Sequence, residues 1–461
     1  MREEIYDGVE IPLQPRPLLA ELSKLKENFD PVALFLILIG GAGVLALAVK
    51  LQLIPYWVEF LNSNAFLRIF TYPLIISAAL ILLGFAFQTY FWTCYKPVTK
   101  NSGEPVEWPF VSVIMPALNE QELVAKSIDS IFAGNYPSDK IEVICINDGS
   151  KDMTYYHMLR ARQKYGNRVK VVNFRKNLGK RHAFYAGLKK AKGEIIVSVD
   201  TDSKVGRSAL RNVVLPLVRD ERTGAVAGRV AALNEKENFL ARMLAIRYSI
   251  SFDFGRAYQS VFGTVLVCPG ALTAYRKSVL MTFVRDWLNQ TFLSTPCGHG
   301  EDRAMTTEVL KRGFFTRYQS NAVVYTQVPA RFGQMNRMYL RWTRSYIREA
   351  ILFARFMFTR YRKEHRILPI FDFVTLNLLP PFHLLALGIV VYSFVVNPLF
   401  ILRHLAVLVA SSFVLSLYYL RTNRSLSFLY GVPYAMVTAF FLWWIVPYSA
   451  LTLKNQSWLT R

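Results

Sequence analysis

Long apolar runs at both ends of this 461-residue chain constrain its fold more than any other feature. One run covers residues 31–53 and has no charged residue before Lys50, and a second covers residues 69–95. Each is long enough to cross about 30 Å of hydrocarbon as a helix. Further runs follow at residues 370–396, 399–420 and 428–453. The pattern predicts transmembrane helices on either side of a central domain, two before it and about three after it.

The flanks of these runs predict how the chain lies across the membrane. Basic residues precede the first run and follow the second, at Lys24, Lys26, Lys96 and Lys100, and cytoplasmic flanks are enriched in Lys and Arg. Residues 1–30 are charged and polar, which indicates a cytoplasmic arm rather than a cleavable signal peptide. The four scattered cysteines suit the same reducing compartment. We therefore expect an integral protein of a bacterial inner (plasma) membrane with a cytoplasmic central domain.

The chain is strongly basic, with 55 Lys and Arg against 32 Asp and Glu and a formal net charge of +23. This balance favours anionic partners such as lipid headgroups, nucleotide phosphates, nucleic acids or acidic polymers. The sequence shows no nucleic-acid-binding motif, and a basic inner face is ordinary for a membrane protein. Membrane lipids are therefore expected partners and nucleic acid is not, while the oligomeric state stays open.

Between the apolar ends, residues 108–330 are predicted to form a soluble α/β domain. β-Branched segments predict strands at residues 111–115, 141–146, 169–174 and 194–199. Helical spacing of apolar residues predicts helices between them at residues 120–132 and 182–192. This alternation is typical of a Rossmann-like fold with a mainly parallel sheet. Ligands of such sheets bind beyond the carboxyl ends of the strands, and the polar clusters of this chain occur there.

Residues 331–366 form a strongly basic amphipathic stretch. Four arginines recur in it at helical spacing, namely Arg337, Arg341, Arg344 and Arg348. Methionines and aromatic residues form the opposite stripe, so we expect interfacial amphipathic helices on the membrane surface. In the apolar run that follows, Asn377, Pro380 and Pro381 predict a break or a partly interfacial segment. Residues 454–461 form a short tail.

An acidic pair, Asp200 and Asp202, follows the fourth predicted strand. Two carboxylates separated by one residue at the end of a buried strand can hold a hard divalent cation, such as Mg²⁺ or Mn²⁺, through oxygen ligands. The cation would bridge diphosphate oxygens and neutralise a departing nucleoside diphosphate. Exposed acidic turns are common, so the pair alone does not distinguish a metal site from a turn.

The clusters after the first three strands each have a structural interpretation when taken alone. Asn119 can cap a helix, and Asp148 followed by Gly149 is a favoured β-turn pair. Lys180 and Arg181 could meet phosphates, but they could equally form a solvated basic turn.

Two later clusters are ambiguous in the same way. Asp302, in Gly300-Glu301-Asp302-Arg303, either caps the helix expected at residues 304–312 or takes a proton from an attacking hydroxyl. Arg341 can hold a phosphate and Trp342 can stack on a sugar. Both residue types are also common at membrane interfaces.

Taken together and in order, these clusters resemble the motifs of processive family 2 glycosyltransferases. The motifs are Pro116…Asn119-Glu120, Asp148-Gly149, Lys176-Asn177-Leu178-Gly179-Lys180-Arg181, Asp200-x-Asp202, Gly300-Glu301-Asp302-Arg303 and Arg341-Trp342. The similarity covers about residues 110–349 and the C-terminal tail, and it is greatest to the branch of hyaluronan synthases and rhizobial chitin-oligosaccharide synthases. It implies a GT-A fold and inverting, metal-dependent transfer from a UDP-sugar to a growing polysaccharide that passes between transmembrane helices.

The resemblance also implies roles for individual residues. Asp302 would be the catalytic base and Asp202 a metal ligand, with Asp200 beside it at the metal, the ribose or the diphosphate. The nucleotide-sugar would be bound by Pro116, Asn119, Glu120, Asp148, Lys180, Arg181, Asp200 and Arg341. The acceptor would be bound by Glu301, Arg303 and Trp342.

One residue departs from the family pattern Q-x-x-R-W. Met338 stands three residues before Arg341, where the family has Gln, and a thioether cannot donate the hydrogen bonds of an amide. Gln334 lies one helical turn earlier and is a hypothetical substitute at the acceptor site. The departure leaves the acceptor sugar and the degree of processivity open.

Three functions are compatible with the sequence. The first is a polysaccharide synthase with a hyaluronan-like or chitin-like product. The second is a non-processive transferase that loads one sugar onto a lipid carrier, which the acidic motifs fit equally well. The third is a transporter or channel with a regulatory domain; intramembrane charges would be expected there, whereas these runs carry few, such as Asp372 and Arg403 near run ends.

Overall fold

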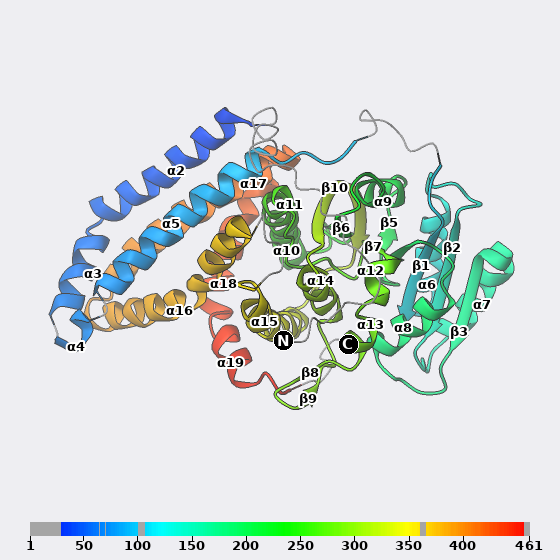
Figure 1. Ribbon diagram of the computed structural model, residues 1–461. Coiled ribbons are helices and arrows are strands. Elements are labelled where there is room, and N and C mark those ends of the chain that lie inside the picture. Colours follow the sequence, from blue (N-terminus) through cyan, green and yellow to red (C-terminus); the bar gives the residue numbers. More distant parts are fainter. Residues whose placement is uncertain (1–28, 64, 70, 100–106, 360–365, 456–461) are drawn as a thin grey trace, which may run out of the picture.

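The computed structural model separates the chain into an array of apolar helices and a β-sheet domain, with further helices between them (Figure 1). It describes residues 29–63, 65–69, 71–99, 107–359 and 366–455. Most of the expected N-terminal arm, residues 360–365 of the basic stretch and residues 456–461 of the tail lie outside these ranges.

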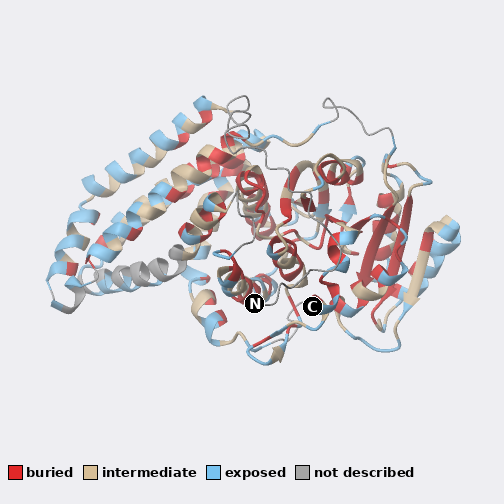
Figure 2. Ribbon diagram, viewed as in Figure 1, coloured by how far each residue is buried: buried red, intermediate tan, exposed pale blue. Residues whose placement is uncertain are grey.

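The apolar part is built from helices that carry many large apolar side chains on their outer surface. Its helices are α2 (Pro31–Lys50), α3 (Leu53–Asn62), α4 (Ala65–Arg68), α5 (Thr71–Thr93), α16 (Ile367–Val396), α17 (Phe400–Asn423), α18 (Gly431–Phe441) and α19 (Ile445–Leu451). Helices α2, α5 and α17 are long and apolar enough to cross a membrane, and the bent pair Leu426–Phe441 and Ile445–Leu451 would make a fourth span. Large apolar side chains such as Phe35 (62% exposed) and Ile39 (54% exposed) cover this surface, which suits hydrocarbon and not water (Figure 2).

The break expected within residues 370–396 falls elsewhere. Helix α16 continues without interruption to Val396, whereas the last apolar run bends by 47° between Phe441 and Ile445. Pro447 lies in the first turn of α19. Proline has no N–H to donate to the preceding turn, so it suits the start of a new helix and opposes continuation of α18.

The sheet is mixed but mainly parallel. Its strands are β1 (Val111–Ala117), β2 (Ile141–Asn147), β3 (Val169–Asn173), β4 (Ile195–Ser198), β5 (Lys204–Val205), β6 (Thr223–Ala232), β7 (Thr273–Arg276) and β10 (Phe315–Thr326), in the order β3-β2-β1-β4-β7-β6-β10-β5. Strands β1 to β4 pair in parallel, and β6 pairs in parallel with β10. Strand β7 pairs antiparallel with β4 and β6, and β5 pairs antiparallel with β10. The parallel sheet predicted from the strand–helix alternation is therefore confirmed.

The strand order creates the crevice in which a ligand is expected. The chain adds β2 and β3 on one side of β1 and then returns to place β4 on the other side. At such a switch point the loops after neighbouring strands diverge and leave a gap at their carboxyl ends. Pro116 lies in the last two residues of β1 and Asp200 follows β4, so the two motifs lie on either side of this gap.

Helices cover the sheet and connect it to the apolar part. They are α6 (Leu123–Phe132), α7 (Thr154–Tyr165), α8 (Lys180–Lys190), α9 (Ala209–Arg219), α10 (Phe239–Ser249), the π-helical turn η3 (Ile250–Arg256), α11 (Ala257–Val261), α12 (Lys277–Met281), α13 (Val284–Leu288), α14 (Glu301–Lys311) and α15 (Phe332–Phe356). Helix α6 begins three residues later than expected because Asn119 and Gln121 adopt positive φ angles of 56° and 48°, which are incompatible with a helix.

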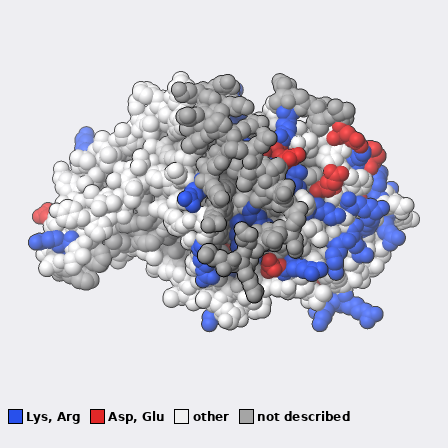
Figure 3. Space-filling view, in the orientation of Figure 1, with Lys and Arg blue, Asp and Glu red and all other residues white. Residues whose placement is uncertain are grey.

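Buried polar contacts fix the sheet domain to the apolar helices. The Trp92 indole of α5 donates to the backbone carbonyl of Asp253 in η3 (2.8 Å). The Asp253 carboxylate accepts a hydrogen bond from Tyr318 on β10 (2.9 Å) and pairs with Arg229 on β6 (2.7 Å). Lys and Arg side chains gather over the sheet domain and are sparse over the apolar helices (Figure 3), as expected for a protein with one end in a membrane.

We predict that Glu142 stabilises the sheet domain. It is buried on β2 and accepts hydrogen bonds from the Ser112 hydroxyl (2.7 Å) and the Lys192 amide (2.8 Å), and it pairs with Lys170 (2.6 Å). Glu142→Ala leaves these donors without an acceptor and should lower stability by about 2–3 kcal/mol. Thermal unfolding in detergent micelles would show this as a lower midpoint, whereas Glu122→Gln, in an exposed pair with Lys126, should leave the midpoint unchanged.

The effect should depend on pH. Burial opposes the charge, but Lys170 and the hydrogen bonds hold the pKa of Glu142 below its ordinary value. The stabilisation is therefore complete above the unfolded pKa of about 4.3 and is lost as pH falls through the folded value. An equal midpoint for Glu142→Ala and the native chain at pH 7 would contradict the prediction.

Candidate active site

One cavity of about 1900 Å³ extends from the carboxyl ends of the sheet strands, past α15, to α5 and α16. Every residue predicted to carry function lines it, with the exception of Arg181. The residues come from the ends of β1, β2 and β4, from the start of α8 and α14, and from α15. Parallel strands bring these distant segments together because their carboxyl ends share one edge of the sheet.

Asp148 and Asn119 shape the wall at the ends of β1 and β2. The Asp148 carboxylate is buried and accepts from the backbone N–H groups of Leu178 (2.7 Å) and Gly179 (3.0 Å). The Asn119 side chain accepts from the Lys151 amide (2.9 Å). These contacts hold the loops after β1, β2 and β3 together. Burial, only partly offset by the two N–H donors, raises the pKa of Asp148.

Lys180 joins two acidic motifs that lie far apart in the sequence. Its ammonium group is 2.7 Å from Asp200 Oδ1 and 2.8 Å from Glu301 Oε1. Lys180 is the first residue of α8, with Gly179 as its N-cap at φ 92°. The sequence suggested a solvated turn or a phosphate ligand for this lysine, whereas the structure places it between two carboxylates.

Glu301 and Asp302 are neighbours with opposite pKa shifts. Burial raises the pKa of both groups, but contact with Lys180 lowers that of Glu301 to about 2. The pKa of Asp302 is raised, first by burial and then by the charge of Glu301. Asp302 Oδ1 accepts from its neighbouring Arg303 amide (2.7 Å), and Oδ2 lies 3.4 Å from the Gly270 amide. Asp302 is thus the carboxylate of this pair that more readily takes a proton.

The acidic pair after β4 offers oxygen ligands suited to a hard cation. Asp202 Oδ1 lies 3.4 Å from the Ser203 hydroxyl and 3.5 Å from the Thr326 hydroxyl, and Lys180 already neutralises part of the charge of Asp200. In the described ranges no group of three or more His, Cys, Asp or Glu residues could hold a metal by itself. The residues fit an ion such as Mg²⁺ that binds one or two carboxylates and completes its shell with phosphate and water.

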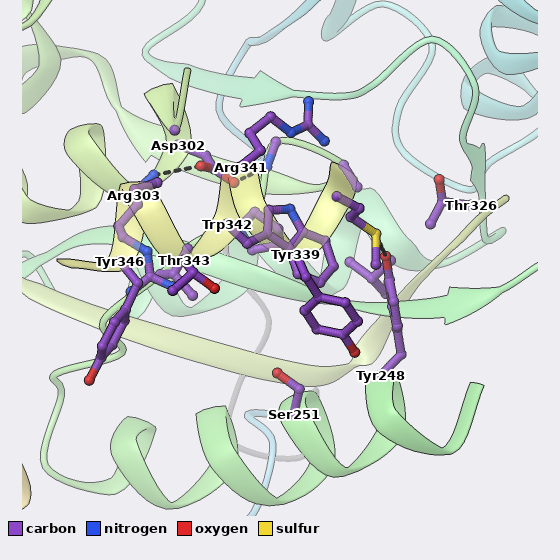
Figure 4. Close-up of a pocket in the computed structure, with 18 of the residues that line it drawn as sticks. Tyr248, Ser251, Asp302, Arg303, Thr326, Tyr339, Arg341, Trp342, Thr343 and Tyr346 are labelled. Carbon is purple, nitrogen blue, oxygen red and sulfur yellow. Dashed lines mark hydrogen bonds between the residues drawn. The ribbon is translucent and has the colours of Figure 1, made fainter. Parts of the chain in front are cut away.

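Helix α15 forms the opposite wall with aromatic and basic side chains. Trp342 is 38% exposed, and its ring lies 5.8 Å from Tyr339 and 5.9 Å from Tyr248. Figure 4 shows Arg341 and Trp342 beside Asp302, with Tyr346 farther along the helix. The Arg303 guanidinium lies 5.1 Å from the Tyr346 ring centroid. An aromatic face next to a candidate base is a surface on which a sugar ring can stack.

Gln334 and Met338 both line the cavity. The Tyr248 hydroxyl lies 3.8 Å from the Met338 sulfur. A thioether is a weak acceptor, so this hydroxyl retains capacity for another partner.

Arg181 faces away from the cavity. Its guanidinium donates to the Trp287 carbonyl and to Gln290 Oε1 (2.8 Å), and it is 5% exposed. Successive residues of a helix point about 100° apart, so Lys180 and Arg181 reach different sides of α8.

Several lining residues were not singled out from the sequence. Tyr248 of α10 and Arg256 of η3 line the cavity, and the Arg256 guanidinium lies 3.8 Å from the Phe252 ring centroid. Burial and then the charge of Arg303 lower the pKa of Arg256 to about 10. The spacing of Tyr248, Phe252 and Arg256 by four residues is the available signal, since it predicts one helical face.

Comparison with known proteins identifies a matching family model and several related proteins. Residues 112–283 match the family model described as Glycosyl transferase family 2. The chain is 29% identical to an N-acetylglucosaminyltransferase of Mesorhizobium japonicum, over 84% of this chain and 91% of that protein. It is 28% identical to a hyaluronan synthase of Streptococcus pyogenes, over 84% of this chain and 89% of that protein.

A solved structure with a similar shape is a mannosyltransferase from Pyrobaculum calidifontis in complex with GDP-Man and Mn²⁺. The TM-score is 0.49 and the sequence identity 20%, over 80% of this chain and 99% of the other. The sugar nucleotide and the metal ion belong to that protein.

Proposed function

Because the chain is a family 2 glycosyltransferase with a GT-A-like domain, related to rhizobial N-acetylglucosaminyltransferases and hyaluronan synthases, we propose that it polymerises sugar from UDP-sugar donors. The product would be a β-linked polysaccharide, hyaluronan-like or chitin-like. The sheet domain would face the cytoplasm, where it meets the donor, and the polymer would leave between the apolar helices of a bacterial inner membrane.

One observation carries this proposal. Motifs from six separate segments of the chain line a single cavity, and Asp302 lies beside Arg341 and Trp342 of α15 within it (Figure 4). A donor diphosphate would lie near Asp202 and Arg341, and an acceptor sugar would stack on Trp342. On this placement Asp302 would adjoin both substrates.

The reaction follows from these positions. Asp302 takes the proton of the acceptor hydroxyl as that oxygen attacks the anomeric carbon of the donor sugar. The new glycosidic bond forms as the bond between the anomeric carbon and the phosphate oxygen breaks, and UDP leaves with that electron pair. Attack from the side opposite the leaving group inverts the anomeric configuration. Asp302 then releases its proton to solvent.

Asp202, with Asp200 beside it, would hold Mg²⁺ or Mn²⁺ together with the diphosphate. The cation would supply charge that neutralises the departing UDP. Arg341 would bind the diphosphate from the α15 side, because the planar guanidinium group suits the geometry of phosphate oxygens. Asp148, Pro116, Asn119 and Glu120 form the wall expected to hold the nucleoside.

The extent of the cavity supports a polymeric acceptor over a single transfer. Beyond Trp342 the cavity continues to Gln88 on α5, to Gln259 on α11 and to Asn377 on α16. The aromatic rings that line the cavity, such as Trp342 and Tyr346, suit a polysaccharide because they can stack on sugar faces. The three amides are hydrogen-bonded within the protein, to Asp372, Tyr346 and the Phe373 carbonyl. A path of this kind between apolar helices is what extrusion of a chain requires.

We predict that Asp302→Asn lowers metal-dependent UDP release by at least about 100-fold, since general-base catalysis typically contributes 10²–10⁴. The assay is UDP release by purified enzyme with Mg²⁺ or Mn²⁺, repeated after chelation, which should also abolish it. Asp286→Asn, which changes an exposed carboxylate (78% exposed) on α13, is the matched control and should behave as the native enzyme. Unchanged UDP release in Asp302→Asn would remove Asp302 from the base role.

The pH dependence of transfer should report the Asp302 carboxyl. A base acts only when unprotonated, so activity should fall as pH drops through the raised pKa of Asp302. Glu301→Gln removes a negative neighbour, so the pKa of Asp302 should fall and the acidic limb of the profile should move to lower pH. The measurement is the rate of UDP release against pH for both enzymes. A limb that stays in place or moves upward would refute this assignment.

Product analysis should distinguish polymer synthesis from lipid loading. Purified enzyme incubated with single and paired radiolabelled UDP-sugars should give a ladder or high-molecular-weight product on a sizing gel. A requirement for two donors would indicate a hyaluronan-like product, and UDP-N-acetylglucosamine alone a chitin-like one. Gln334→Ala should shorten the product if its amide replaces that of the family Gln. Label found only on an extractable lipid would overturn the polymer proposal.

A further inference from the structure

The loop that carries Asp302 is held by a closed ring of hydrogen bonds behind the cavity. The Trp287 indole donates to the Glu301 carbonyl (2.9 Å), and Arg348 Nη2 donates to the His299 carbonyl (2.8 Å). Both carbonyls belong to the segment that leads into α14. The ring therefore contacts the backbone on either side of Gly300, two residues before Asp302.

The remaining bonds of the ring connect these two anchors. Arg348 Nε pairs with Glu349 Oε1 (2.9 Å), and the same oxygen accepts from Gln290 Nε2 (3.1 Å). Gln290 Oε1 accepts from Arg181 (2.8 Å), which also donates to the Trp287 carbonyl and so returns to the first anchor. Arg348 and Glu349 are 2% and 3% exposed. Figure 1 shows α14 and α15 side by side in the middle of the molecule, between the sheet domain and the apolar helices.

Steric fit adds to the hydrogen bonds at Gly300. This residue has φ 73°, and a Cβ there would overlap the Ser345 hydroxyl and approach Arg348 Nη2 to 3.0 Å. Ser345 and Arg348 lie on one face of α15, one turn apart. The helix that presents Trp342 to the cavity thus also fixes the backbone of the Asp302 loop.

Within the buried ring, an ion pair and hydrogen bonds offset the cost of burying charged groups. Glu349 compensates Arg348, and Gln290 connects that pair to Arg181 without adding charge. Burial and then the charge of Arg348 lower the pKa of His299 to about 4, so the imidazole beside the ring is neutral at physiological pH. Removing Glu349 would leave two buried guanidinium groups without this partner, which is strongly unfavourable.

We propose that Arg348, held by Glu349, Gln290 and Arg181, is a positioning residue that sets the distance between Asp302 and the acceptor on Trp342. The proposal rests on the proposed base role of Asp302. Arg348 touches neither substrate; it acts by tying the Asp302 loop to α15, so that base and acceptor platform move as one unit. Misplacing a reacting group by about 1 Å costs up to about 100-fold in rate.

The test is a double-mutant cycle on UDP release. Arg348→Met should lower kcat about 10-fold or more and leave KM for the UDP-sugar within about twofold, because Arg348 bonds to Glu349 and the His299 carbonyl, neither of which lines the cavity. In the Asp302→Asn background, Arg348→Met should cause no further loss, since a residue that acts through Asp302 has nothing left to position. Arg348→Lys should restore part of kcat.

Arg344→Met is the matched control. Arg344 is equally buried on α15 but donates to Thr452 at the end of α19 (3.0 Å) and not to the Asp302 loop. Its effect, if any, should persist unchanged in the Asp302→Asn background. Should Arg348→Met fail to fold, the same cycle with Gln290→Ala, which changes no charge in the ring, carries the test.

The outcomes separate the two assignments. Full activity of Asp302→Asn would overturn the base role and the positioning role with it. A large loss in Asp302→Asn, combined with an equal and additive loss from Arg348→Met in both backgrounds, would overturn the positioning role alone. A rise in KM with unchanged kcat in Arg348→Met would also overturn it.

Discussion

The two ion pairs of Lys180 are the interaction on which the site depends. Four carboxylates line one cavity, namely those of Asp200, Asp202, Glu301 and Asp302. Like charges that are close together and partly shielded from water repel strongly. Lys180 contacts one carboxylate from each motif, so it offsets this repulsion and fixes the strand-β4 motif against α14. It also lets Glu301 stay charged while Asp302 keeps a raised pKa.

The sequence was sufficient to predict the parallel sheet and where its polar motifs meet. Buried strands read as β-branched runs, and the geometry of a parallel sheet then places whatever follows each strand at one edge. The later part of the cavity could not be predicted in this way. Tyr248 and Arg256 lie on helices, and their approach to α15 depends on tertiary packing around η3, a π-helical turn that periodicity does not reveal.

Arg181 illustrates a second limit of motif reasoning. Lys180 and Arg181 occur together in the motif, and both were expected at the nucleotide. On a helix, neighbours diverge by about 100°, so one basic side chain enters the cavity and the other turns toward Trp287 and Gln290. The sequence places both residues in one motif. The structure shows that Lys180 pairs with carboxylates in the cavity, while Arg181 bonds to Trp287 and Gln290 behind it.

Met338 tests how far a family pattern determines a site. With Met338 in place of the Gln of the family motif, α15 lacks an amide at this position. Two other polar groups line the cavity nearby, the Tyr248 hydroxyl opposite the sulfur and Gln334 one turn earlier. Neither group occupies the place of the missing amide, because each starts from a different backbone position. Arg341 and Trp342 meanwhile keep their positions beside Asp302. On the proposed roles, the cavity still holds the groups of the donor side, and the substitution would act on the acceptor side, where hydrogen-bond direction selects between sugars.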